Sequence, residues 1–450
     1  MKRYDAYRHS GIDWIGEIPS GWNVLPLKRV IQQERQITYG IVQPGEVDPN
    51  GRFMIRGQDY SFGWNDPEKI FRVSSQIEEP YKRSRVKEND ILLTIVGAGT
   101  GNLSIVPKWL DGANLTQTTA RIAINEEKAN HKFVYFLLQS EIGKANARIW
   151  IKGAAQPGLN LGHVKIFNII LPKIEEQNVI VDYLEGKVQK IDQVIQQKEL
   201  LLEKLQAKRQ AIINEAVTKG LNPNVPMKPS GVEWLGDIPE HWHAKQIKHI
   251  KDPSQNSFVD GPFGSNLKSE HFIEDGPVLV IESGFITKGQ FIEKKFKTIS
   301  QEHFETIKRS ECKEGDIIIS KIGANYGMSG ILPDLGRQAV VSGNSMKLTV
   351  DKERCNIEFI HFCLLFLKTS GVLKLIVNET AQPALSLGTM NNLHIPLPSL
   401  NEQNEIIVVV KKRIGVVDKL NSLLVKQIEK LKGYRQSLIS EVVTGKIKVV

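Results

Sequence analysis

The chain repeats itself, and this internal repeat constrains its fold more than any other feature of the sequence. The segment SGIDWIGEIPSGW at residues 10–22 returns as SGVEWLGDIPEHW at residues 230–242, which lie 220 residues further on. A second segment begins with AAQPGLNLG at Ala154 and returns as TAQPALSLG at Thr380, 226 residues further on. Several matches at nearly one offset do not arise by chance. The sequence therefore predicts a tandem duplication whose repeat is far longer than the roughly 20–50 residues of a solenoid unit.

Two segments, residues 31–89 and 251–315, have no convincing match in the other half. The six residues by which the offset grows also fall there. One scaffold that carries two different inserts is what we expect if each half recognises a different target.

Each half ends in a tract in which apolar residues alternate at three- and four-residue spacing, the pattern of a coiled-coil seam. The predicted seam residues are Ile191, Ile195, Leu202, Leu205 and Ile212 in the first tract, and Val417, Leu424, Ile428, Leu431 and Leu438 in the second. Lys198 and Arg209 interrupt the first seam, and Asn421 and Arg435 interrupt the second. These polar residues either fix the register of the helices or lie at the edge of their interface, and the sequence leaves both readings open.

Such a narrow apolar stripe needs a partner, and the other tract of the same chain is the simplest one. We therefore expect two antiparallel helices of about 35 residues, roughly 50 Å long, which return the C-terminus to the first half. The predicted fold class is α+β, a tandem pseudo-two-fold duplication of two α+β domains separated by this pair of long helices. The domains are placed at residues 1–184 and 223–410, and the helices at 185–222 and 411–450.

Within each domain, the repeated N-terminal segment is expected to be an irregular clasp that buries Trp14 and Trp22, or Trp234 and Trp242. Short strands follow, then one helix at residues 131–149 or 357–377, a loop that contains Ala-Gln-Pro, and a last strand that ends at a proline. This is an α+β pattern with small sheets.

The segment VGAGTGN at residues 96–102 looks like the glycine loop of an S-adenosylmethionine or dinucleotide site. Such a loop requires a helix after it, whereas here Pro107 follows and no helical period is present. In the other half only Gly323 and Gly327 correspond, to Gly97 and Gly101. The alternative is a glycine-rich turn that allows close approach of the backbone, and it is favoured.

The sequence contains no recognisable catalytic, phosphate-binding or metal-binding motif. No phosphate-binding loop and no Asn/Asp-Pro-Pro-aromatic signature of amino methylation occur, and His163 and His394 are expected to be structural. Cys312, Cys355 and Cys363 have no metal-ligand spacing. We predict no catalytic residues, no metal site and no cofactor for this chain.

The net charge is +9, from 59 basic and 50 acidic residues, which permits a polyanionic partner without requiring one. No apolar run is long enough to cross a bilayer, and the N-terminus lacks the apolar core of a signal peptide. We expect a cytoplasmic protein.

Candidate nucleic-acid contacts are Lys, Arg, Gln, Asn, aromatic and small residues in the loops, mostly within the unmatched inserts. Basic side chains neutralise phosphates, and Arg, Gln and Asn can bond base edges in pairs. The candidates are Arg56, Gln58, Tyr60, Trp64, Lys82, Arg83 and Arg85 in the first half, and Gly264, Ser265, Asn266, Lys268, Lys321, Asn325 and Tyr326 in the second.

The N-terminal clasp, the Ala-Gln-Pro loop before a strand ending in Leu-Pro, the EEQ or NEQ lead-in and the terminal EVVTGKI resemble, in this order, the specificity (S) subunit of type I restriction–modification systems. The resemblance covers nearly the whole chain, twice. It implies that each domain is a target recognition domain for one part of a split, asymmetric site in double-stranded DNA, and that the helices are spacers.

The resemblance further implies two modification subunits, which bind S-adenosylmethionine and methylate adenine. It leaves open whether two restriction (nuclease and translocase) subunits that use ATP and magnesium also join. The long, dissimilar inserts prevent transfer of base-contacting positions from any relative. Two rivals remain: a methyltransferase that uses the glycine loop, and a coiled-coil adaptor that binds only proteins.

Overall fold

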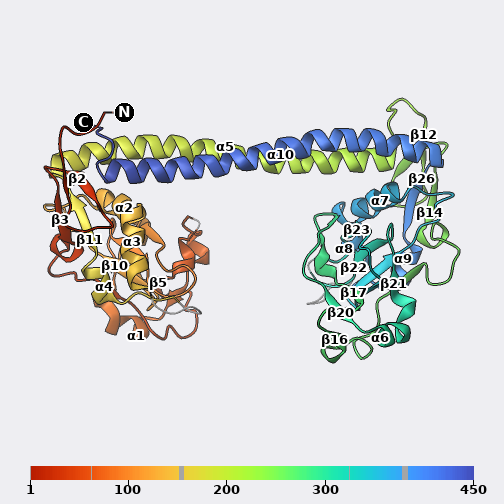
Figure 1. Ribbon diagram of the computed structural model, residues 1–450, viewed down its shortest axis with the longest axis horizontal. Coiled ribbons are helices and arrows are strands. Elements are labelled where there is room, and N and C mark those ends of the chain that lie inside the picture. The colour runs from red at the N-terminus through yellow and green to blue at the C-terminus, as the bar shows by residue number, and fades with distance from the viewer. Residues whose placement is uncertain (1, 62, 152–156, 324, 378–383, 450) are drawn as a thin grey trace. The chain divides into compact units, whose positions relative to one another are not determined.

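The computed structural model of the chain describes residues 2–61, 63–151, 157–323, 325–377 and 384–449. Its internal contacts divide it into two units, Met1–Glu199 with Val425–Val450 (unit 1) and Leu200–Leu424 (unit 2). Each unit contains one α+β globule and part of each of two long helices (Figure 1). The Ala-Gln-Pro loops predicted from the sequence lie largely outside the described residues.

Unit 1 is built on an antiparallel four-stranded sheet in the order β4-β10-β7-β8. A three-stranded sheet, β6-β5-β9, and two strand pairs, β1-β2 and β11-β3, complete it. The strands are β1 (Tyr7–His9), β2 (Glu17–Pro19), β3 (Asn23–Pro26), β4 (Thr38–Tyr39), β5 (Arg52–Ile55), β6 (Arg72–Val73), β7 (Ile91–Thr94), β8 (Leu103–Ile105), β9 (Asn114–Leu115), β10 (Thr119–Ile122) and β11 (Asn168–Leu171). The helices of the globule are α1 (Ser75–Glu78), α2 (His131–Gln139), α3 (Glu141–Trp150) and α4 (Leu161–Lys165).

Strand β7 shows why the sequences of the central strands are continuous runs of apolar residues. Ile91 and Leu93 face the main core, which also contains Phe133 of α2, whereas Leu92 faces a second core with Ile55 and Tyr60. Because successive side chains of a strand point to opposite faces, a strand between two cores needs apolar residues at every position.

Unit 2 repeats this frame in the order β15-β25-β22-β23, and it adds a larger sheet, β16-β20-β17-β24-β21, in which every strand except β24 comes from the insert. The strands are β12 (Met227–Pro229), β13 (Asp237–Pro239), β14 (His243–Gln246), β15 (Phe258–Asp260), β16 (Phe272–Ile273), β17 (Val278–Ile281), β18 (Ile286–Thr287), β19 (Gln290–Phe291), β20 (Lys297–Ile299), β21 (Glu311–Cys312), β22 (Ile317–Ser320), β23 (Ser329–Ile331), β24 (Ala339–Val341), β25 (Ser345–Leu348) and β26 (His394–Leu397). The helices are α6 (Gln301–Thr306), α7 (Ile357–Thr369), α8 (Val372–Ile376) and α9 (Leu387–Asn392).

Two local predictions are wrong. The single helix expected in each domain is broken into α2 and α3 at Ser140, which caps the second helix, and into α7 and α8 at Gly371, whose φ is +85°. The clasp contains a short antiparallel strand pair in each unit and buries Trp22 and Trp242, but Trp14 is 37% exposed.

The long helices are α5 (Ile174–Lys219) and α10 (Leu400–Val443), with 46 and 44 residues. Both start about eleven residues before the predicted boundaries at 185 and 411, because the lead-in segments already carry apolar residues such as Ile180 and Ile406 into the cores. At 1.5 Å per residue they measure about 69 and 66 Å, longer than the 50 Å expected.

Within each unit the two helices run antiparallel. In unit 1, Asp192 pairs with Arg435 at 2.8 Å and, further along α5, Lys198 donates to Gln427 at 2.7 Å. In unit 2, Arg209 pairs with Asp418 at 3.0 Å. The predicted seam residues are all buried or half-buried: Ile191, Ile195, Leu202, Leu205, Ile212, Val417, Leu424, Ile428, Leu431 and Leu438.

These polar pairs favour the register interpretation of the interrupted seams. Arg435 and Asp418 lie 226 residues after Arg209 and Asp192, so the same ion pair occurs once in each unit. Asn421 differs, because its Oδ1 is buried without a hydrogen-bond partner among the residues that the structure describes.

The start of each long helix is fastened to the clasp in the same way. Trp22 Nε1 donates to Glu176 Oε1 at 3.3 Å, and Trp242 Nε1 donates to Glu402 Oε1 at 3.0 Å. The end of the chain returns to unit 1, where the Tyr7 hydroxyl donates to the Gly445 carbonyl at 2.9 Å. The predicted return of the C-terminus to the first half is confirmed.

Candidate nucleic-acid interface

Three loops meet at one end of the strands of the four-stranded sheet in unit 1. They are residues 40–44 after β4, 95–102 between β7 and β8, and 116–118 before β10. Ile41 N donates to Leu115 O at 2.6 Å, Gln117 N to Ile41 O at 2.9 Å, and Ile95 N to Thr118 O at 2.8 Å. A Cβ at Gly40 would lie 1.8 Å from Leu115 O, so only glycine allows the first loop to lie this close. We call this the three-loop surface of unit 1.

Unit 2 has the corresponding three-loop surface, formed by residues 261–266, 321–328 and 342–344, of which residue 324 is not described. Lys321 N donates to Asn344 O at 2.8 Å, the counterpart of the bond between Ile95 and Thr118. A Cβ at Gly261 would lie 2.0 Å from Ser342 O, so this position is also restricted to glycine. The same backbone frame therefore presents different side chains in the two units.

The glycine segments form tight turns in both surfaces. Gly97, Gly101, Gly323 and Gly327 all have positive φ, between +77° and +98°. In unit 1 the turn joins β7 to the antiparallel β8 rather than to a helix. The favoured prediction of a glycine-rich turn is confirmed, and the strand–turn–helix of a nucleotide-binding loop is not formed here.

Two of the seven candidates in unit 1 line its three-loop surface. Arg56 and Gln58 border a hollow of about 540 Å³ together with Gly99 and Gln117. Gln58 and Gln117 are exposed, whereas the Arg56 guanidinium is held by Asp59 at 2.9 Å. The hollow thus presents two exposed amides, the groups that can bond adenine in pairs, beside a fixed cation.

Tyr60 and Trp64 are structural residues. Tyr60 is 4% exposed, its hydroxyl lies 2.7 Å from Thr94 Oγ1, and burial raises its pKa. Trp64 donates from Nε1 to Ile105 O at 3.3 Å, and its ring contacts those of Tyr60 and Trp109. These aromatic side chains stabilise the insert and are not available to bases in this conformation.

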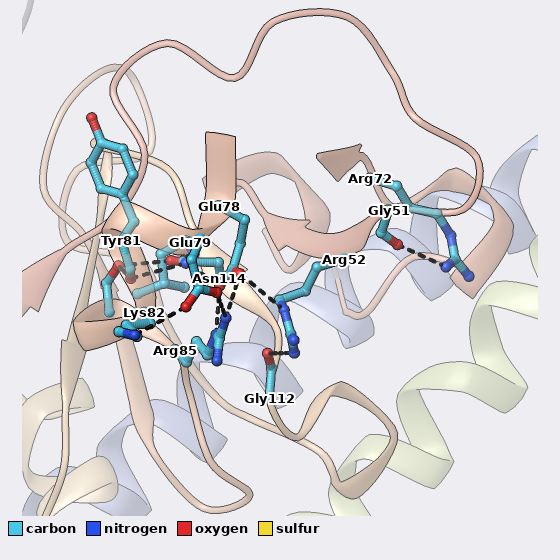
Figure 2. Close-up of polar contacts among 12 residues, drawn as sticks. Gly51, Arg52, Arg72, Glu78, Glu79, Tyr81, Lys82, Arg85, Gly112 and Asn114 are labelled. Atoms are coloured by element: carbon cyan, nitrogen blue, oxygen red, sulfur yellow. Dashed lines mark hydrogen bonds and ion pairs between the residues drawn. The ribbon is translucent and has the colours of Figure 1, made fainter. Parts of the chain in front are cut away.

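Two of the three basic candidates at residues 82–85, Lys82 and Arg85, lie beside the carboxylate cluster of Glu78 and Glu79 (Figure 2). Arg85 donates to both oxygens of Glu78 at 2.6 Å and to Glu79 at 3.0 Å. Lys82 pairs with Glu79 at 3.0 Å and remains exposed, as does Arg83. Of the three, Arg85 is committed to an internal ion pair.

Glu78 is the centre of this cluster and is 2% exposed. It also accepts from Asn114 Nδ2 at 2.9 Å and faces Arg52 Nε at 3.3 Å, as Figure 2 shows. The hydrogen bonds from Arg85 hold the pKa of Glu78 below its usual value. The cluster attaches α1 and the following turn to β9, so Arg52 and Arg85 stabilise the insert.

In unit 2, five candidates lie in the three-loop surface with exposed backbone or side chain: Gly264, Ser265, Asn266, Asn325 and, at half-exposure, Lys321. Lys321 Nζ pairs with Asp260 at 2.7 Å. Lys268 is exposed just beyond the first loop. Tyr326 is buried, with Lys368 Nζ 3.8 Å from the centre of its ring, and is structural.

The sequence reasoning missed four residues of the three-loop surfaces: Val42 and Gln117 in unit 1, and Phe263 and Asn344 in unit 2. Gln117 and Asn344 lie within a matched part of the repeat, in the dissimilar segments LTQTTA and VSGNSM. A local mismatch inside a matched region was the signal that could have found them. The exposure of Val42 and Phe263 has no such signal, because the sequence does not distinguish an exposed apolar loop residue from a buried one.

Among the described residues no group of three or more His, Cys, Asp or Glu side chains is arranged to hold a metal ion. His163 stacks on Trp150 with 4.2 Å between ring centres, and burial raises the pKa values of all three cysteines. No helix in the described part of the chain has the length and apolar character needed to cross a membrane.

Comparison with known proteins identifies the family. The model of the type I restriction modification DNA specificity domain matches residues 38–204 and again 264–431. The chain is 32% identical over 203 residues to the EcoBI specificity subunit of Escherichia coli, a match that covers 44% of this chain and 42% of that protein. It is 23% identical over 368 residues to the MjaVIII specificity subunit of Methanocaldococcus jannaschii, covering 81% and 80%.

The fold agrees with these matches. A chain from a solved structure of the type I R-M system aligns with a TM-score of 0.67 at 16% identity, covering 96% of this chain and 99% of that one. The two family matches together span more than half of the sequence and fall once in each repeat. The chain therefore belongs to the family of DNA specificity subunits of type I restriction–modification systems.

Proposed function

We propose that this chain recognises an asymmetric, two-part site in double-stranded DNA, and that each unit reads one part through its three-loop surface. The supporting observation is that both units present the same backbone frame with different side chains. Unit 1 offers Gln58 and Gln117, and unit 2 offers Asn266 and Asn344, all of them exposed. Amide side chains bond base edges in pairs, and unlike amide arrangements specify unlike sequences.

Exposed cations outside these loops position the duplex without specifying its sequence. Arg83 and Lys82 have this role in unit 1, and Lys268 has it in unit 2. Because each phosphate contact releases counterions, binding of the assembled complex weakens as salt rises. The adaptor that binds only proteins would show no such dependence on salt.

The chain binds two modification subunits, and it positions them rather than catalysing a reaction itself. The repeat supports two equivalent docking sites: the clasp, the last strand and the start of the long helix recur in both halves. In each unit one equivalent hydrogen bond organises this region, from Trp22 to Glu176 in unit 1 and from Trp242 to Glu402 in unit 2. S-adenosylmethionine binds to the modification subunits.

Between the two half-sites lies a stretch of DNA whose sequence is not recognised, the gap. The length of α5 and α10 sets the length of this gap. Both helices continue from one unit into the other, and ion pairs hold their register within each unit. A change in the number of helical residues therefore alters the length of the gap and leaves the recognised base sequences of the half-sites unchanged.

Methylation mapping tests this function. The genome of the host is sequenced for methylated adenines with the gene present, with the gene deleted, and with the gene restored. A single asymmetric two-part motif that disappears on deletion supports the proposal. Methyl transfer by the purified chain without any partner would instead favour the methyltransferase reading.

A further inference from the structure

An aromatic side chain is held out in solvent at the three-loop surface of unit 2. Phe263 is 79% exposed, in the segment Gly261-Pro262-Phe263-Gly264. Burying a phenylalanine side chain stabilises a protein by about 1.5–3 kcal/mol, and this ring forgoes most of that gain. A single exposed apolar residue is common on protein surfaces. Whether Phe263 has a function therefore depends on the residues around it.

The loop that carries Phe263 is fixed at its base. Gly261 N donates to Ser345 O at 3.0 Å, and a Cβ at Gly343 would lie 2.6 Å from Pro262 O, so the two loops touch through their backbones. Pro262 restricts its own φ, and Asn266 N closes the turn on Phe263 O at 2.7 Å. The ring is therefore presented by a preorganised turn.

Polar and charged groups surround this ring. Lys321 Nζ lies 6.0 Å from the ring centre, and Gly264, Ser265 and Asn266 are exposed beside it. A protein partner would require a contiguous apolar patch, which these neighbours do not provide. An isolated ring among hydrogen-bonding groups and a cation instead matches a nucleic acid, whose bases have apolar faces and polar edges.

The first unit has an apolar residue at the same place in the frame. Ala120 pairs with Tyr39 in unit 1, and its counterpart Met346 pairs with Asp260 in unit 2, so Val42 occupies the position of Phe263. Val42 is 42% exposed at the edge of the hollow that contains Gln58 and Gln117. An exposed apolar tip is therefore a property of both three-loop surfaces, with a large ring in one and a small side chain in the other.

We propose that Phe263 is a specificity-determining wedge, which inserts its ring at a base step of the second half-site, unstacks it and bends the duplex there. This inference rests on the proposed function and adds a shape-dependent contact to it. Steps that unstack easily, such as TA and CA/TG, are favoured beneath the ring. Val42, which is too small to unstack a step, makes only a surface contact in the first half-site.

The test uses the full chain assembled with its modification subunits and a duplex that carries the mapped site. 2-Aminopurine, whose fluorescence rises on unstacking, replaces each purine of the second half-site in turn. We expect a several-fold rise at one step with the wild-type chain, and no rise with Phe263→Ala. Affinity for the specific duplex should fall about 10-fold in that variant, as expected for one lost base contact.

Phe263→Leu, which keeps an apolar wedge, should retain part of the fluorescence rise. Ile273→Ala removes another exposed apolar side chain of unit 2 and should change nothing. If Phe263→Ala binds the site with the wild-type fluorescence rise, or loses only its modification subunits, the wedge is refuted while the proposed function stands. If the wild-type complex shows no preference for any duplex, the proposed function itself is refuted.

Discussion

Lengthening the paired helices by one turn tests whether they set the gap between the half-sites. Four helix-forming residues are inserted after Gln206 in α5 and another four after Leu420 in α10. The ion pair between Arg209 and Asp418 shows that these positions face each other within unit 2. Inserting into both helices keeps the pairs on either side in register, and an insertion of four residues is a stutter that coiled coils accommodate.

The expected change in gap length follows from the geometries of the α-helix and of the DNA duplex. Four helical residues add about 6 Å, and at about 3.4 Å per base pair this translation corresponds to roughly two base pairs. They also add about 400° of rotation, roughly 40° beyond a full turn, which is close to the twist of one base pair. We therefore expect the accepted gap to lengthen by one or two base pairs.

Methylation mapping of the variant complex reads the gap and the half-site letters in one experiment. Insertion into α5 alone is the matched control, because it moves Arg209 away from Asp418 and should weaken assembly rather than change the gap. Altered letters with an unchanged gap in the double insertion would refute the spacing role of the helices.

Other predictions follow from the ionised groups. Arg85→Ala should destabilise unit 1 by about 2 kcal/mol in urea unfolding, because it leaves the buried Glu78 short of its main partner, whereas Lys82→Ala, which breaks an exposed pair, should change stability by less than about 1 kcal/mol. Equal effects would argue against the buried cluster. Arg209→Leu should lower the thermal midpoint of unit 2, and a charge swap with Asp418→Arg and Arg209→Asp should restore most of it if the pair sets register. Burial lowers the pKa of His361 from 6.5 to about 4. The unfolded chain therefore binds a proton in this range that folded unit 2 does not, and stability should fall from pH 6.5 to pH 4 by up to about 1.4 kcal/mol per pH unit, a slope that His361→Gln should reduce.

Much of the fold was predictable because its signals are periodic and occur twice. The seam residues from Ile191 to Leu438 follow a spacing that only paired helices satisfy, and runs such as Ile91-Leu92-Leu93 indicate strands between two cores. The exposure of Trp14 was not predictable, because it depends on tertiary packing, which overrides the local apolar pattern. The break at Gly371 had a local signal, since Ser-Gly marks a turn and glycine readily adopts a positive φ.

The candidate interface was predicted less well for a physical reason. A sequence shows which side chains can bond DNA, but it does not show which are already bonded within the protein. Arg85 is held by Glu78, and Tyr60 bonds Thr94, so residues of suitable chemistry became structural ones. Gln58 is exposed, and the exposure of Phe263 depends on a backbone turn that no residue pattern reveals.

Paired methylation maps can show whether the two three-loop surfaces read separate half-sites. One map is made with Gln117→Ala in unit 1 and the other with Asn344→Ala in unit 2, each beside the wild-type chain. We expect each variant to relax the base sequence of one half-site only, a different half-site for each variant, with the gap unchanged. A variant that altered both half-sites, or two variants that relaxed the same one, would contradict it.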